Sequence, residues 1–149
     1  MRKTLFFLIL LFSPVVLFAA PADVMEDLLA EEKASFGKAA YFVLVAAEVL
    51  PDNATPEEAA ALLNETGWKK MNKDADDSIT LGELSFLIMK TFRLKGGVLY
   101  SILPGPRYAA RELSYLKFFS GRPAPGRAVS GEEVLRILGR VLDYKGGAQ

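Results

Sequence analysis

The sequence has no histidine and no cysteine among its 149 residues. The absence of cysteine excludes disulfides, iron–sulfur centres and cysteine-based zinc sites, and the absence of histidine excludes Ser–His and Cys–His catalytic pairs. A basic excess is also lacking, because 18 Lys and Arg residues balance 18 Asp and Glu residues. Most familiar enzyme chemistry is thereby removed, and we expect no nucleic-acid partner.

The remaining composition is that of a folded domain. Hydrophobic residues make up 51% of the chain and charged residues 24%, which excludes a disordered or low-complexity protein. A length of 149 residues fits one domain. Asp74 and Asp76 could act as acid and base in glycoside hydrolysis, but a loop described below accounts for them better. We predict that the protein is not an enzyme.

The N-terminus is typical of a secretory signal peptide. Arg2 and Lys3 precede an apolar run over residues 5–18, and small residues follow at positions 19–22. We predict cleavage after Ala22, which leaves 23–149 as a single exported domain in the periplasm or outside the cell. The apolar run is shorter than the roughly 20 residues that cross a bilayer, so we expect no stable membrane span after removal of the leader.

Apolar spacing and capping signals predict an all-α fold. Apolar residues recur at helical steps over 24–50, with Gly37 expected to break or bend the helix and 39–49 expected to form the central core helix. The other signals are a helix start at Thr55-Pro56, capping boxes at Thr80–Glu83 and Ser130–Glu133, a helix end at Lys95-Gly96-Gly97, and a helix over 107–119. At most a minimal two-stranded bridge is expected, around Ile79 and Val129.

One segment suggests a specific chemistry. Residues 72–83 have the sequence Asn-Lys-Asp-Ala-Asp-Asp-Ser-Ile-Thr-Leu-Gly-Glu, which resembles the EF-hand calcium loop within a unit spanning about 57–92. Such loops direct alternate oxygen atoms at one Ca²⁺ ion and close its shell with a glutamate at position 12. The resemblance implies these ligands: Asn72, Asp74, Asp76, Ser78 through its carbonyl, Thr80 and Glu83.

The loop departs from the family pattern at two positions. Asn72 replaces the usual Asp at position 1, and Asp77 stands at position 6, where Gly with positive φ is usual. Fewer ligand charges imply low calcium affinity. The alternative is an acidic turn in which Thr80 and Glu83 only cap the following helix.

A shift of 50 residues superposes a second, degenerate copy over about 107–142. Ile79-Thr80-Leu81-Gly82-Glu83 falls on Val129-Ser130-Gly131-Glu132-Glu133. Arg122, Ala124 and Gly126 stand at loop positions 1, 3 and 5 there, so this copy lacks a set of calcium ligands. Because EF-hands occur in pairs, we expect the backbones of Ile79 and Val129 to exchange hydrogen bonds.

The same repeat also resembles, more loosely, the surface-layer-homology module. In that family a turn with an apolar residue and Thr or Ser precedes a helix with Glu near its start, after an aromatic-rich helix such as residues 115–121. The resemblance implies binding to cell-wall polysaccharide, or to an envelope protein. Three residues at one helix start could bind an anionic ligand or pair with surface acids: Arg107, Tyr108 and Arg111.

Overall fold

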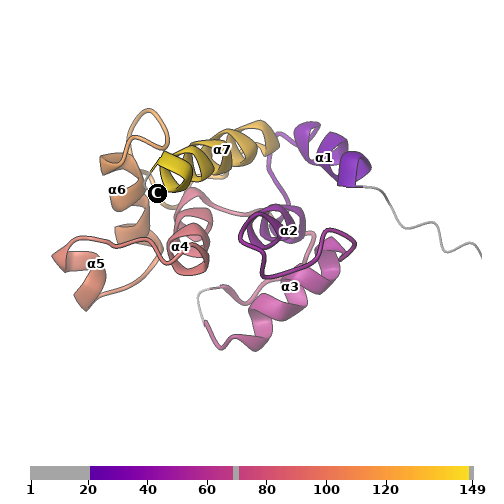
Figure 1. Ribbon diagram of the computed structural model, residues 1–149, viewed down its shortest axis with the longest axis horizontal. Helices are drawn as coiled ribbons and strands as arrows, with labels where there is room; N and C mark the ends of the chain where they lie inside the picture. Colours follow the sequence, from indigo (N-terminus) through magenta and orange to yellow (C-terminus); the bar gives the residue numbers. More distant parts are fainter. Residues whose placement is uncertain (1–20, 69–70, 148–149) are drawn as a thin grey trace, which may run out of the picture.

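A computed structural model of the chain describes residues 21–68 and 71–147. The predicted leader falls almost wholly outside them. The described ranges contain seven α-helices and no sheet, which confirms the all-α prediction (Figure 1). The helices are α1 (Pro21–Leu29), α2 (Phe36–Ala46), α3 (Pro56–Glu65), α4 (Leu81–Thr91), α5 (Val98–Ile102), α6 (Pro106–Tyr115) and α7 (Gly131–Gly147).

Helix α2 is the central core helix that the sequence predicts, but it spans Phe36–Ala46 instead of 39–49, and Glu48 beyond its end takes a left-handed conformation. It is apolar on nearly every face, and it packs against α1, α3, α4 and α7. Gly37, however, does not break the helix, since the chain turns at residues 30–35 and Gly37 lies in the first turn of α2. A Cβ atom on Gly37 would lie 2.8 Å from the Ala75 side chain, so this glycine permits close packing against the loop of the next unit.

Six of the helices form three helix–loop–helix units, with α5 inserted between the second and the third. The units are α1–α2, α3–α4 and α6–α7. The second helix of each unit packs on the first helix of the next: α2 on α3, α4 on α6, and α7 on α1. The contact between α7 and α1, visible in Figure 1, closes this order into a ring.

A cycle of three backbone hydrogen bonds joins the three loops at the centre of the molecule. Ala34 N–H donates to Val129 O at 2.7 Å, Ile79 N–H to Ala34 O at 2.9 Å, and Val129 N–H to Ile79 O at 3.4 Å. All three side chains are fully buried. Ile79 and Val129 therefore meet as predicted, and the predicted minimal antiparallel bridge joins their loops, but it pairs Thr80 with Ala128. The predicted mutual exchange between Ile79 and Val129 was wrong, because Ile79 N–H bonds to Ala34 in the loop of the first unit.

The helix starts follow the sequence signals more closely than the helix ends do. Thr55 and Thr80 form complete capping boxes, whereas at Ser130 only the hydroxyl accepts a helix N–H. The predicted end at Gly96-Gly97 was wrong, because α4 ends at Thr91 and Arg93 takes the left-handed conformation, with φ 52°. Helix α6 likewise ends at Tyr115, and the short α5 was not predicted.

Candidate functional site

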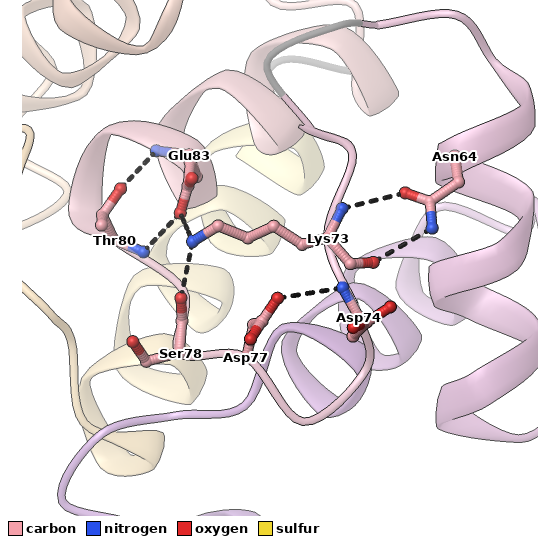
Figure 2. A network of polar contacts seen from close by, with 7 residues as sticks. All are labelled: Asn64, Lys73, Asp74, Asp77, Ser78, Thr80 and Glu83. Carbon is pink, nitrogen blue, oxygen red and sulfur yellow. Dashed lines mark hydrogen bonds and ion pairs between the residues drawn. The ribbon is translucent and has the colours of Figure 1, made fainter.

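The loop that resembles an EF-hand carries a lysine at its centre. Lys73 Nζ donates to the Ser78 carbonyl at 2.8 Å and to Glu83 Oε2 at 2.9 Å (Figure 2). Two of the six predicted calcium ligands therefore bind the ammonium group. Glu83 Oε2 also accepts the Thr80 N–H at 2.8 Å, and Thr80 Oγ1 accepts the Glu83 N–H. Thr80 and Glu83 thus act as a helix cap in this structure.

The other predicted ligands face water. Asn72, Asp74 and Asp76 are exposed, and the Asp74 N–H is held by Asp77 Oδ2 at 3.0 Å. Among the residues that the structure describes, no three acidic side chains gather into a metal-binding group.

The backbone also departs from an EF-hand. Among described residues other than glycine, positive φ occurs at Glu48, Arg93 and Lys117, so Asp77 lacks the conformation usual at position 6. Helix α3 ends at Glu65, seven positions before the loop begins at Asn72. A calcium ion would have to displace Lys73 and draw the exposed acids inward, and calcium binding stays a prediction.

The Lys73–Glu83 pair has a counterpart in each of the other units. Lys38 binds Glu31 at 2.7 Å, and Arg127 binds Glu133 at 2.5 Å. In each pair one member lies on the second helix of its unit: Lys38, Glu83 or Glu133. Each of these residues lies four positions after the residue of the same unit that takes part in the hydrogen-bond cycle, which is Ala34, Ile79 or Val129 respectively. One partly buried ion pair therefore recurs in every unit, with its polarity reversed in the first.

Two of these pairs shift the pKa of a member. Burial raises the pKa of the Glu31 carboxyl, but hydrogen bonds from Lys38 and from the Ser35 backbone outweigh burial and hold it below the ordinary value. The hydrogen bond to Glu133 raises the pKa of Arg127. Both shifts mean that the folded protein favours the charged forms of Glu31 and Arg127.

The first unit, α1–α2, was missed as a repeat by the sequence analysis, although a signal for it existed. Ala34-Ser35-Phe36-Gly37-Lys38 aligns with Ile79-Thr80-Leu81-Gly82-Glu83, and both segments have a hydroxyl residue before the helix and a glycine at its second position. The spacing is 45 residues here and 50 residues between the other two copies. This difference arises because α5 and its flanks are inserted only once.

A cleft of about 800 Å³ lies where the start of α4 meets the start of α6. It brings the predicted ligand residues Arg107 and Tyr108 beside Thr80 and Glu83. Its other walls are glycine, proline and apolar residues of the neighbouring loops: Ile102, Leu103, Pro104, Gly105, Pro106, Pro125 and Gly126. The cleft therefore joins residues that the sequence analysis assigned to separate sites.

The third predicted ligand residue, Arg111, lines a different hollow. This hollow has a volume of about 540 Å³ and is bounded by Val98, Leu99 and Tyr115 among others. Tyr108 borders both spaces, with Arg107 on one side and Arg111 on the other. The structure thus separates the two arginines of the predicted cluster.

Comparison with protein-family models, with curated proteins and with solved structures gives no match to this chain. No helix within residues 21–68 and 71–147 has the length and apolar character needed to cross a bilayer.

Proposed function

We propose that the protein is an exported, non-catalytic binding module of the bacterial envelope, and that an anionic cell-wall polysaccharide binds in the cleft between α4 and α6. The observation that carries this proposal is the meeting of Arg107 and Tyr108 with Thr80 in one open cleft. These residues come from two units, so the site depends on how the units pack.

The cleft offers the groups that an acidic sugar chain needs. Arg107 is exposed, and none of the four ion pairs within the described residues includes it. A free guanidinium can bind a carboxylate or phosphate through two parallel hydrogen bonds. Tyr108 adds a half-buried ring with a polar tip, and the Thr80 hydroxyl retains its own proton to donate.

Prolines in the walls of the cleft favour a site that is already ordered before a ligand binds. Pro104, Pro106 and Pro125 line the cleft, and their fixed φ angles limit the motion of its walls. A site that is ordered before the ligand arrives loses less conformational entropy on binding.

The single carboxylate in the cleft supports the proposal of a non-catalytic role. Among the cleft-lining residues Glu83 is the one acid, and it is engaged by Lys73 and by the Thr80 N–H. Glycoside hydrolysis ordinarily requires two carboxyl groups on opposite sides of the bond that is broken. The proposal therefore includes no reaction.

The cyclic arrangement of units supports the resemblance to surface-layer-homology modules. That resemblance was based on an apolar turn residue, a hydroxyl residue and a helix with an early glutamate. The chain has three turns with the apolar and hydroxyl residues, at Ala34, Ile79 and Val129, joined by one cycle of hydrogen bonds. The early glutamate follows the second and third turns, whereas Lys38 takes its place after the first. A family that occurs in tandem fits three copies better than it fits one.

Co-sedimentation of the protein with purified bacterial cell-wall polysaccharide tests the proposal. Arg107→Gln should weaken binding at least tenfold, because a hydrogen bond from a charged group contributes about 1.5–3 kcal/mol. Tyr108→Ala should also weaken binding, because the aromatic contact and the phenol hydroxyl are lost. Arg136→Gln is the matched control, since Arg136 is an exposed arginine on α7 outside the cleft. Equal binding by all three variants, or no binding of the unaltered protein, would refute the proposal.

A further inference from the structure

The short helix α5 carries an unusual surface. Its residues Val98, Leu99 and Ile102 are 74%, 51% and 68% exposed, and Leu103, which follows it, is 56% exposed. Tyr115 of α6, which borders the same hollow as Val98 and Leu99, is 82% exposed. We call these five residues the α5 patch. Monomeric proteins seldom expose so many large apolar side chains together unless the surface has a partner.

The α5 patch is held in place by the core. Tyr100 is the buried residue of α5, and its ring lies against Gly96, where an added Cβ would be 2.5 Å from the ring. Burial, together with the nearby Glu112 carboxylate, raises the pKa of Tyr100. Because this anchor orients the helix, the outward direction of Val98 and Ile102 is a feature of the fold.

Cationic residues lie beside the α5 patch. The segment 84–111 contains five cationic residues and no acidic residue: Lys90, Arg93, Lys95, Arg107 and Arg111. Lys90 and Arg93 border hollows lined by residues of α2, α3 and α7, which leaves Lys95, Arg107 and Arg111 for the patch. Arg111 borders the hollow beside Val98 and Leu99, together with Glu112, and Arg107 borders the cleft beside Ile102 and Leu103, together with Glu83, which is paired with Lys73.

Shape indicates what kind of partner this surface suits. In Figure 1, α5 projects at one end of the molecule, far from α1 in that view. Helix α6 is the main helix that α5 packs against. A projecting apolar helix flanked by cations matches the boundary of a bilayer, where acyl chains lie beneath charged headgroups. Tyrosine is enriched at the same boundary, which fits the exposed Tyr115.

We infer that the α5 patch docks on the surface of an anionic lipid bilayer. Val98, Leu99, Ile102 and Leu103 enter the headgroup region, while Lys95 and Arg111 contact lipid phosphates. This docking involves no helix that crosses the bilayer. Because Ile102 and Leu103 also line the cleft between α4 and α6, docking would place that cleft at the membrane face, whereas Val98 and Leu99 lie outside the cleft.

Vesicle co-sedimentation tests the inference. The sample is a chain starting at Pro21, which contains every described helix, and circular dichroism checks that it remains helical. Vesicles contain phosphatidylcholine with or without about 30% phosphatidylglycerol as the anionic lipid. We expect binding to the anionic vesicles only, weakened by added salt because the charges at the surface become screened.

Variants separate the apolar contribution from the charge contribution. Val98→Ser/Leu99→Ser should weaken binding at least tenfold, because both apolar side chains lose their transfer into the interface. Met25→Ser/Leu29→Ser is the matched control, since those residues are 42% and 49% exposed on α1. Lys95→Gln should weaken binding about fivefold, as expected for one cation near an anionic surface, whereas Lys33→Gln in the α1–α2 turn should not.

The outcomes are decisive and independent of the polysaccharide test. No binding to anionic vesicles, or equal binding by Val98→Ser/Leu99→Ser and the α1 control, overturns the inference. A concentration-dependent dimer that this double variant abolishes would also overturn it, because the α5 patch would then serve a second copy of the chain. Neither Val98, Leu99 nor Lys95 lines the polysaccharide cleft, so failure of one proposal leaves the other standing.

Discussion

Lys73 Nζ lies 2.9 Å from Glu83 Oε2 and binds it as an ion pair, in the loop where the sequence predicts calcium. The side chains of Lys73 and Glu83 are only 25% and 14% exposed. The lysine supplies one positive charge at two of the oxygens that a divalent cation would use. Any calcium bound to this loop must therefore compete with a residue of the loop itself.

Calcium at several millimolar should raise the melting temperature of the protein, and should raise it more in Lys73→Gln. The variant removes the competing ammonium and leaves the oxygens of Ser78 and Glu83 in place. A ligand at ten times its dissociation constant stabilises the folded state by about 1.4 kcal/mol. Thermal melting with and without calcium measures the difference for each variant separately, so the destabilisation caused by the lost ion pair cancels.

Asp76→Asn is the control for this calcium response. It removes one ligand charge without touching the cap formed by Thr80 and Glu83, and magnesium should stabilise less than calcium. A lack of any calcium response at about 10 mM in both the unaltered protein and Lys73→Gln would show that the loop is structural, since extracellular calcium modules bind at about 10⁻⁴–10⁻³ M.

Gly82→Ala should destabilise the protein by about 1–3 kcal/mol, the usual cost of overpacking. A Cβ there would lie 2.8 Å from Pro125 Cβ and 2.9 Å from the Pro125 carbonyl oxygen, where two units meet. Gly139→Ala is the matched control, because that exposed position in α7 has nothing within 4 Å, and it should stabilise by about 0.5–1 kcal/mol. Urea unfolding measures both changes, and equal effects would contradict the tight unit contact.

The Glu31–Lys38 pair should make stability depend on pH below neutrality. The folded-state pKa of Glu31 lies below the unfolded value of 4.5, so its contribution is complete above that value and is lost as the pH falls through the folded-state pKa. Glu31→Gln should therefore lose less stability than the unaltered protein between about pH 6 and pH 3. Lys38→Met should also flatten this part of the curve, because Lys38 helps to lower the pKa. Parallel curves for all three proteins would disprove the assignment.

Export should remove the leader. Mass spectrometry of protein recovered from the native envelope should detect a chain that starts near Asp23, because Arg2 and Lys3, the apolar run and the small residues at 19–22 form a cleavable signal. Mature protein that retains Met1 would contradict this prediction. In the structure α1 begins at Pro21, so cleavage after Ala22 would shorten its first turn.

The local signals in the sequence predicted the starts of α3, α4, α6 and α7 but not the helix α5. The capping box at Thr80–Glu83 was predictable because its interacting atoms lie only three residues apart, and the predicted helix start at Thr55-Pro56 also forms one. The all-round apolar character of residues 39–49 indicated a central helix, since such a surface must be buried. Helix ends were predicted less well, because Arg93 and Lys117 take left-handed conformations that glycine would have marked.

By itself, the sequence determined the fold class, the buried turn residues Ile79 and Val129, and the chemical groups available for binding. The tertiary structure alone decided that Ala34 completes a cycle with them, that Lys73 binds the predicted calcium ligands, and that Arg107 and Arg111 line separate spaces. The cycle depends on contacts between segments 45 to 95 positions apart, from Ala34 to Ile79 and to Val129. The Lys73 contacts span only 5 and 10 positions, but they depend on how the loop folds back on the start of α4. The spacing of residues along the chain determines which of them can share a helix face. The packing of α7 against α1, which is a tertiary contact, determines which units meet.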